Sequence, residues 1–243
     1  MTMTDLHALP VVSVTPVGAR QTLIVLDAEH SPVPIDHRIP GQYVKASLWR
    51  DDVPRPYAIA SRPGSPTLEL LVKLPSGDAA GDAAAEQRRT ALLSMLPGEK
   101  VRVSRAEGRG YPLDVLRGKD VLVVGVGTGI APLRSLMETM LLERMAFGEL
   151  TLLYGVQQPD DLAFRSRFGP WAGLSVRVVP VVSRPGGSDW SGAAGYVQDH
   201  LPKMLSRPDH THAVVCGLPE MDRVVTARLL ELGVGRERVH RNW

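Results

Sequence analysis

Three short segments of the chain carry residue types that could take part in chemistry. Arg55-Pro-Tyr57 places a guanidinium two residues from an aromatic ring, Gly125-Val-Gly-Thr-Gly129 is a glycine-rich turn, and Cys216-Gly-Leu-Pro-Glu-Met221 contains the only cysteine. A guanidinium matches the geometry of phosphate, and a tyrosine offers a flat apolar face with a polar tip. Glycines let a backbone approach a phosphate closely, and the helix that follows offers free N–H groups. These residue types suit ligands that carry phosphate.

The glycine-rich turn follows the apolar run at 121–124 and precedes a helix predicted over 132–145. Its spacing is G-x-G-x-G, so Ile130 stands where the dinucleotide-binding fingerprint has its third glycine. Pro132 fits the first turn of a helix, where a missing N–H has no cost. The strand–turn–helix context favours a pyrophosphate site, and a sharp turn without a ligand is the alternative.

The elements before residue 117 are short β-branched runs separated by Gly and Pro. Strands are predicted at 11–14, 22–26, 43–48, 68–73 and 100–103. Several short strands without long helices between them are typical of a small antiparallel barrel. One helix is predicted over 85–96, where Leu92, Leu93 and Leu96 form an apolar stripe before Pro97-Gly98.

After residue 117 apolar strands alternate with helices. Strands are predicted at 121–124, 150–154, 176–182 and 213–216, and a second helix over 219–232. This alternation indicates a parallel sheet covered by helices on both faces. The chain is therefore predicted to have two domains, an antiparallel β-barrel at 1–117 and an α/β domain at 118–243.

Composition excludes several classes of protein. Of 243 residues, 44% are hydrophobic and 22% are charged, which is ordinary globular usage. A single cysteine cannot form an intramolecular disulfide, a four-thiolate iron–sulfur cluster or a Cys-based zinc site. The pair His210-x-His212 has no neighbouring Cys or Glu pattern, so no metal site is predicted. A net charge of +2 gives no argument for nucleic acid.

Targeting signals are not expected. The first ten residues lack a basic start followed by an apolar run, so no signal peptide is predicted. No apolar stretch approaches the roughly 20 residues that span a bilayer. We therefore expect a cytoplasmic protein without a membrane segment.

Taken together, the motifs resemble the ferredoxin–NADP reductase superfamily, in which a flavin-binding barrel precedes a nicotinamide-binding α/β domain. The resemblance runs from Pro40-Gly41-Gln42-Tyr43 to Trp243, nearly end to end. Besides the three opening segments, it includes Pro97-Gly98-Glu99, Leu153-Tyr154-Gly155 and the terminal aromatic residue. The order and spacing of these segments carry the likeness.

The resemblance implies an FAD site on the barrel, with FMN as the alternative. Arg55 would bind the flavin phosphate, Tyr57 would lie against the isoalloxazine ring, and Thr90 would meet the pyrophosphate at the opening of a helix. Ala58 departs from the family, which usually has a hydroxyl there near flavin N5. The residues implied for FAD are Arg55, Pro56, Tyr57, Ala58, Ile59, Val72, Lys73, Arg89, Thr90 and Trp243.

The resemblance also implies a nicotinamide nucleotide site, for NADP in preference to NAD. Thr128 and Gly129 would meet the pyrophosphate, Ser183 and Arg184 would hold the 2′-phosphate, and Tyr196 would stack on adenine. The basic residue that the family places just before this tyrosine is absent. The residues implied for NADP are Gly127, Thr128, Gly129, Ser183, Arg184, Tyr196, Gln198, Cys216, Gly217 and Met221.

Three residues are implied in hydride transfer. Cys216 would face the nicotinamide C4, and Trp243 would cover the flavin until the nicotinamide stacks there. Ser61 is the nearest hydroxyl that could replace the one missing at Ala58. The family's proton-relaying Glu near the terminus is not matched, because Arg241 stands two residues before the end. No acid/base residue is therefore named.

Two flavin-dependent functions remain open, beside a flavin-free nucleotide-binding module that would require the Arg55 motif to be accidental. The first is a flavin-dependent oxidoreductase that transfers hydride between NAD(P)H and FAD and then electrons to a carrier such as ferredoxin or flavodoxin. The second is a non-catalytic electron-transfer subunit of a larger redox complex, similar to that of dihydroorotate dehydrogenase but without its cysteine cluster. Either function requires a redox partner protein, and neither nucleic acid nor membrane is expected as a partner.

Overall fold

The first half of the chain folds into an antiparallel sheet that closes on itself. A computed structural model describes residues 6–48, 53–74 and 83–242. The strands of the first sheet are β1 His7–Gly18, β2 Gln21–Asp27, β3 Tyr43–Ser47, β4 Arg55–Ala58, β5 Thr67–Lys73 and β6 Lys100–Val103. They have the order β4-β3-β6-β1-β2-β5, and every pairing is antiparallel. A bridge between Ile59 and Leu70 joins the two ends of this order, which confirms the predicted barrel.

Alternating burial along the strands explains the barrel. In β2 and β5 the buried side chains include Ile24, Leu26, Leu70 and Val72, each 2% exposed or less. Side chains alternate across a strand, so these residues fill one interior while their neighbours face outward. Strand β4 is not among the sequence predictions, because a four-residue segment containing Pro56 carries no period-2 pattern.

Two helices accompany the barrel. The first, α1, is a single turn at Val33–Asp36. The second, α2, spans Ala83–Leu93 rather than the predicted 85–96. Alanines at 83–85 have the highest helix propensity, so the helix begins earlier than the apolar stripe indicates.

The second half forms a parallel sheet, as predicted. Its strands are β7 Asp120–Val126, β8 Leu150–Val156, β9 Val176–Val182, β10 Ala193–Ala194, β11 Thr211–Cys216 and β12 Val239–His240. They have the order β10-β9-β8-β7-β11-β12. All residues of β8 and all but the last of β7 are buried, as expected for strands covered on both faces.

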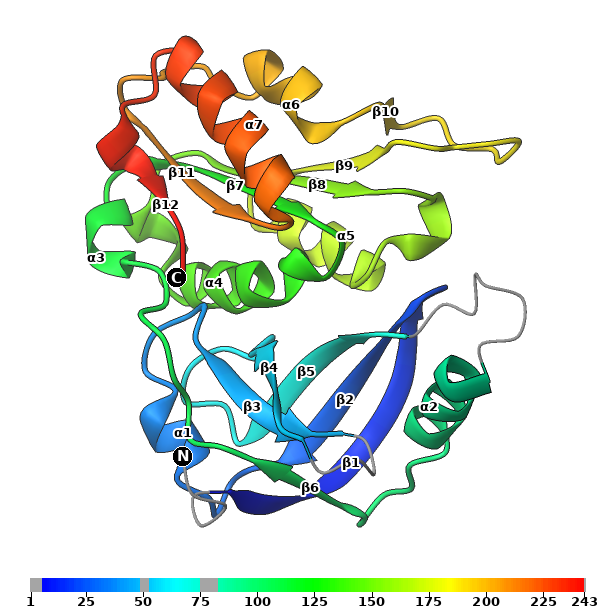
Figure 1. The fold of residues 1–243 in the computed structure, drawn as a ribbon. Coiled ribbons are helices and arrows are strands. Elements are labelled where there is room, and N and C mark those ends of the chain that lie inside the picture. Colours follow the sequence, from blue (N-terminus) through cyan, green and yellow to red (C-terminus); the bar gives the residue numbers. More distant parts are fainter. Residues whose placement is uncertain (1–5, 49–52, 75–82, 243) are drawn as a thin grey trace.

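Helices cover both faces of the parallel sheet (Figure 1). The helices are α3 Leu113–Leu116, α4 Ile130–Leu142, α5 Arg165–Gly173, α6 Val197–His200 and α7 Pro219–Glu231. In Figure 1, α4 lies between the parallel sheet and the barrel, whereas α6 and α7 lie on the far face. Helix α5 was not predicted, since its residues show no apolar stripe and include Pro170.

The two sheets share a continuous core across their junction. One buried cluster unites Ala60 and Leu71 of the barrel with Ala131 and Leu133 of α4. A charged network crosses the same junction: the guanidinium of Arg134, 3% exposed, donates to Glu69 of β5 and, at 2.9 Å, to Glu138 of α4. Hydrophobic burial and a buried ion network therefore both hold the barrel against α4.

A second contact lies at the turn between β1 and β2. Arg20 pairs with Asp161 at 2.6 Å, and the backbone N–H of Ala19 donates to the carbonyl of Asp160 at 2.7 Å. These contacts join the barrel to the segment after β8. The relative placement of the two sheets is thus set at more than one point.

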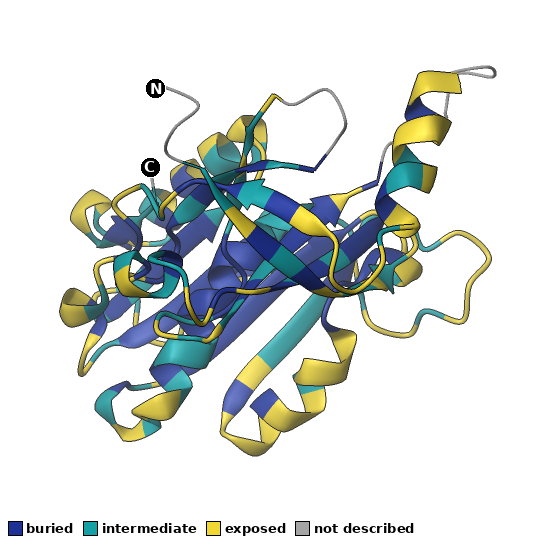
Figure 2. Ribbon diagram, turned by 90° about the horizontal axis from the view of Figure 1, so that it is seen from below, coloured by how far each residue is buried: buried dark blue, intermediate teal, exposed yellow. Residues whose placement is uncertain are grey.

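Burial is concentrated in the strands of both sheets, and the exposed residues lie mainly on the outer helices and turns (Figure 2). Within the described part of the chain, none of the helices combines the length and the apolar character needed to cross a membrane.

Candidate functional site

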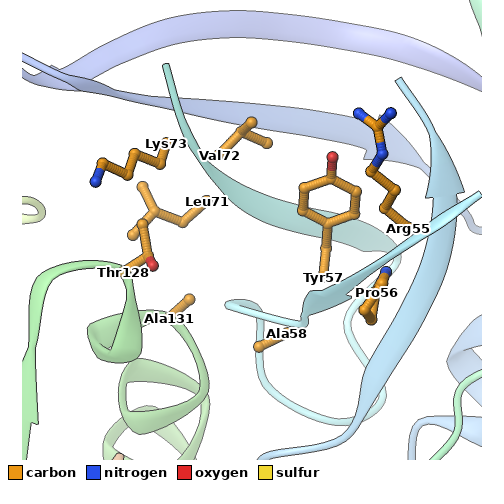
Figure 3. Close-up of a pocket in the computed structure, with 9 residues that line it drawn as sticks. All are labelled: Arg55, Pro56, Tyr57, Ala58, Leu71, Val72, Lys73, Thr128 and Ala131. Carbon is orange, nitrogen blue, oxygen red and sulfur yellow. The ribbon is translucent and has the colours of Figure 1, made fainter. Parts of the chain in front are cut away.

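A cavity lies between the barrel and the amino-terminal end of α4 (Figure 3). Its volume is about 380 Å³, within the range of about 300–1,000 Å³ that is usual for ligand sites. The lining residues are Arg55, Pro56, Tyr57, Ala58, Leu71, Val72, Lys73, Thr128 and Ala131. All of these except Leu71 and Ala131 are among the residues chosen from the sequence.

Strand β4 presents the two residues that resemble the flavin motif. Arg55 pairs in register with Ala46 and Tyr57 with Val44, so the two side chains extend from the same face of the strand. Figure 3 shows the phenol ring and the guanidinium pointing the same way, with Pro56 and Ala58 on the other side. The arrangement offers a flat ring beside a group that binds anions.

Strand β5 and helix α4 face one another across the cavity. Ala131 and Arg134 are three residues apart on one side of α4, and Thr128 lies in the 3-10 turn directly before this helix. Along β5, Leu71 and Lys73 line the cavity, and Glu69 contacts Arg134. Glu69 and Arg134 do not themselves line the cavity, and their ion pair joins the same strand and helix beside it. Exposed Lys73 and half-buried Thr128 line the open part of the cavity.

The glycine-rich turn is a short 3-10 segment, η2 Gly127–Gly129, between β7 and α4. A Cβ at Gly129 would lie 2.5 Å from the carbonyl oxygen of Cys216, so only glycine allows this approach of the turn to β11. Gly127 has φ +53°, and its carbonyl accepts a hydrogen bond from the Tyr154 hydroxyl at 3.1 Å. The turn is held rigidly at the carboxyl ends of the parallel strands, where ligands bind in such sheets.

Cys216 ends β11 directly beside this turn. It is opposite Gly125 in the register of β7 and β11. The thiol is partly buried, and burial raises its pKa to about 11; the nearby charge of Asp222 also raises it. Met221 folds over Gly217, since a Cβ at Gly217 would lie 2.2 Å from the Met221 Cε. The predicted Cys-Gly-x-Pro-x-Met segment therefore runs from the last residue of β11 into the first turn of α7.

The residues implied for the 2′-phosphate and adenine lie outside the cavity. Ser183 and Arg184 follow β9, and their backbone N–H groups donate to the carbonyls of Val156 and Gln157. The Arg184 side chain is exposed, and Tyr196, at the start of α6, is 60% exposed. Gln198 lies in α6, half-buried. These side chains stand at the carboxyl edge of the sheet and are accessible to a ligand.

Several predicted residues are not brought to the cavity. Ile59 is fully buried in the barrel core, and Ser61, 3% exposed, accepts a hydrogen bond from the backbone N–H of Glu69. The hydroxyl expected to replace the one missing at Ala58 is thus engaged elsewhere. Trp243 lies outside the described residues.

The expectation that Thr90 opens a helix is wrong. Helix α2 begins at Ala83, so Thr90 lies roughly two turns inside it. A backbone N–H at that depth is bonded to a carbonyl one turn earlier and is not free for phosphate. Arg89 and Thr90 do not line the cavity, and the Thr90 side chain is exposed.

Sequence reasoning missed Leu71, Ala131 and Arg134. The first two supply apolar walls, and Arg134 contributes the buried charge network behind them. A three-residue spacing from Thr128 could have marked Ala131 and Arg134 as one helix face. No local pattern relates Arg134 to Glu69, which is distant in sequence.

Comparisons with known proteins identify the family. Residues 123–227 match the model of the oxidoreductase NAD-binding domain. The chain is 32% identical over 211 residues to ferredoxin–NADP reductase B of Sorangium cellulosum, covering 82% of each protein. The chain belongs to the ferredoxin–NADP reductase superfamily. The chain is also similar to sulfhydrogenase 1 subunit gamma of Pyrococcus furiosus. The two are 28% identical over 154 residues, which cover 62% of this chain and 52% of the relative.

A solved structure confirms the superfamily fold. The ferredoxin NADP+ reductase of Neisseria gonorrhoeae, with bound FAD and NADP, superposes with a TM-score of 0.78 over 98% of this chain and 99% of that one. Because the sequence identity is 21%, this likeness concerns the fold. It agrees with the barrel and the parallel sheet described above.

Proposed function

We propose that this chain is a flavin-dependent oxidoreductase that transfers hydride between NAD(P)H and FAD and passes electrons to a one-electron carrier. The observation that carries the proposal is the composition of the cavity. Residues assigned to flavin, including Tyr57 and Lys73, and Thr128 assigned to the nucleotide line the same space. Two cofactors that exchange hydride must meet in one place. The family membership supports the same reaction.

The residues present fit a flavin. The Tyr57 ring, Leu71 and Ala131 offer flat or apolar surface, and Arg55 and Lys73 offer positive charge for phosphate. A bound flavin would supply the chemistry of accepting a hydride and releasing single electrons. The barrel would hold the flavin ring, and the α4 N-terminus with Thr128 would receive the nucleotide pyrophosphate. The proposed flavin is FAD in preference to FMN. The proposed boundary between the flavin-binding and nucleotide-binding domains is at residue 117.

A hydride-transfer assay tests the proposal. The purified chain, loaded with FAD, is mixed with NADPH or NADH in a stopped-flow spectrophotometer, and the flavin absorbance is followed. We expect bleaching of the flavin band with at least one nucleotide. If neither nucleotide reduces the bound flavin, the proposed reaction is refuted. A screen with ferredoxin-type and flavodoxin-type acceptors then identifies the class of carrier.

The choice of nucleotide rests on Arg184. Replacing Arg184 by alanine should weaken NADPH binding about 10- to 100-fold and NADH binding much less, because a hydrogen bond to a charged group contributes about 1.5–3 kcal/mol. Titration of each nucleotide measures both effects. Arg177→Ala is the matched control, since this exposed arginine of β9 donates to the Lys203 carbonyl instead. Equal losses for the two nucleotides would contradict NADP as the preferred cofactor.

The alternative is an electron-transfer subunit of a larger complex, and one observation favours it. A relative of this chain is the gamma subunit of a sulfhydrogenase. Gel filtration and co-purification separate the two functions. A stable monomer that reduces dyes with NAD(P)H supports the independent enzyme, whereas activity only within a complex supports the subunit.

A further inference from the structure

The turn between β1 and β2 reaches from the barrel to the segment that follows β8. Arg20 lies in this turn, and its guanidinium binds the carboxylate of Asp161 through two donors. The Nε atom donates to Oδ1 at 3.1 Å, and the Nη2 atom donates to Oδ2 at 2.6 Å. The Nη2 atom also donates to the side-chain oxygen of Gln157 at 3.1 Å. Because a two-pronged pair fixes orientation as well as distance, the guanidinium holds both residues in a defined geometry.

Neighbouring contacts keep the turn and the segment together. The backbone N–H of Ala19 donates to the carbonyl of Asp160 at 2.7 Å, and the side-chain amide of Gln21 donates to the carbonyl of Asp161 at 3.0 Å. The Asp161 side chain is 6% exposed and that of Arg20 is 36% exposed. Because the carboxylate is shielded from water, its bonds to the guanidinium are stronger than those of an exposed pair.

One peptide unit after β8 is bonded at both of its polar groups. Its N–H, which belongs to Gln158, donates to Asp161 Oδ2 at 3.2 Å. Its carbonyl, which belongs to Gln157, accepts the backbone N–H of Arg184 at 2.8 Å. A peptide unit is planar and rigid, so the position of its carbonyl follows that of its N–H. A continuous path therefore runs from Arg20 through Asp161 and this peptide unit to the backbone of Arg184.

Arg184 lies beyond the paired part of the parallel sheet. The register of β8 and β9 ends at Val156 and Val182, two residues before Arg184. After that point the N–H of Ser183 donates to the Val156 carbonyl at 3.0 Å, and the bond from Arg184 follows. The Arg184 side chain is exposed, so its position follows from that of its backbone. A shift of the peptide unit at 157–158 would therefore move this guanidinium.

We propose that Arg20 is a positioning residue for the 2′-phosphate site and acts through Asp161 on Arg184. This inference rests on the proposed function, in which Arg184 holds the 2′-phosphate of NADP. It adds that the barrel, through its β1–β2 turn, sets the affinity of the second domain for that phosphate. The Arg20 guanidinium binds the carboxylate and does not itself contact the nucleotide.

Two adenine nucleotides that differ by one phosphate test the positioning role. Adenosine 2′,5′-bisphosphate and adenosine 5′-monophosphate are each titrated into the full chain by calorimetry, which requires no flavin reduction. Arg20→Met should weaken binding of the bisphosphate about 5- to 20-fold, which is part of the loss expected for Arg184→Ala, and binding of the monophosphate less than about twofold. Unchanged binding of the bisphosphate, or equal weakening of both nucleotides, would overturn the proposal.

Arg117→Met is the matched control for this titration. The Arg117 side chain is 40% exposed, against 36% for Arg20, and it pairs with Glu143 away from the 157–161 segment. We expect this control to bind both nucleotides as the unmodified chain does. A loss of bisphosphate affinity as large as that of Arg20→Met would show that removal of any such arginine has this effect, which would refute the specific role.

Asp161→Asn separates positioning from direct contact with the phosphate. The substitution keeps the positive charge of Arg20 and removes the negative charge beside it. If Arg20 bound the phosphate directly, the bisphosphate would bind more tightly, because a nearby repulsive charge is gone. Positioning predicts weaker binding, since an amide offers one acceptor oxygen where the carboxylate offers two. Tighter or unchanged binding would contradict the proposal.

A double-mutant cycle identifies the residue through which Arg20 acts. In an Arg184→Ala background, Arg20→Met should cause no further loss of affinity for the bisphosphate. A further loss of the same size would show that Arg20 acts independently and would refute the inference. If the unmodified chain binds the two nucleotides equally, NADP as the preferred cofactor is refuted, and this inference with it. If the unmodified chain prefers the bisphosphate and Arg20→Met retains that preference, this inference alone is refuted.

Discussion

Replacing Arg134 by methionine should lower the free energy of unfolding by about 3–5 kcal/mol, because it leaves two largely buried carboxylates without the guanidinium that bonds them. The guanidinium is 3% exposed, donates to Glu69 and Glu138, and lies 4.6 Å from the centroid of the Phe164 ring. Glu69 and Glu138 are only 17% and 20% exposed, so water cannot replace the lost bonds fully. Urea unfolding, followed by circular dichroism and tryptophan fluorescence, measures the change.

A control and a rescue make this prediction specific. Arg167→Met removes an arginine that is 52% exposed and stands 3.9 Å from Glu138, so its effect should stay below about 1 kcal/mol. Adding Glu69→Leu to Arg134→Met should recover part of the loss, since removing both partners of a buried pair is less harmful than removing one. A loss as small as that of Arg167→Met would mean that the network does not hold the barrel against α4.

Gly129→Ala should reduce the rate of flavin reduction by NADPH by about 100-fold while the flavin stays bound. The added Cβ would lie 2.5 Å from the Cys216 carbonyl oxygen and 2.9 Å from its carbon, both backbone atoms. The start of α4 or the end of β11 must then move, which displaces Thr128 and Cys216 together. A displacement of about 1 Å at such a site can cost 100-fold in rate. The flavin residues on β4 and β5 are not affected.

The measurement distinguishes loss of bound flavin from slower reduction of the flavin by the nucleotide. Flavin content is read from absorbance and flavin reduction from stopped-flow traces of the same preparation. Gly173→Ala, at the end of α5, is the control, because a Cβ there meets nothing within 4 Å. Loss of flavin in Gly129→Ala, or reduction at the normal rate, would contradict the assignment of this turn to the nucleotide.

The fold was predictable where local patterns are strong. Short β-branched runs separated by Gly and Pro indicated an antiparallel barrel, and apolar strands alternating with helices indicated the parallel sheet that follows. Strand β4 and helix α5 escaped prediction, because Pro56 and Pro170 interrupt segments that tertiary packing nonetheless holds in regular conformations. Thr90 was placed at a helix opening by the family resemblance, although it lies inside both the helix predicted over 85–96 and the observed α2.

Individual residues of the candidate site could be predicted from the sequence, but the cavity that they line together could not. Arg55 and Tyr57 could be chosen for their chemistry, and the glycine-rich turn for its backbone freedom. That Lys73 and Thr128 line one cavity depends on how the barrel packs against α4. Arg134 carried no signal in the sequence, because its partner Glu69 is far away along the chain.

The sequence by itself determined most of the longer strands, which turn can approach a phosphate, and that flavin is the only expected redox centre of a chain with one cysteine. Such features depend on the chemistry and periodicity of neighbouring residues. The tertiary structure alone decided that the Arg55-Pro-Tyr57 segment and the glycine-rich turn share a cavity, and that Arg134 of α4 pairs with Glu69 of the barrel. These contacts arise when two sheets bury their apolar faces against each other, and no local pattern encodes the register of that packing.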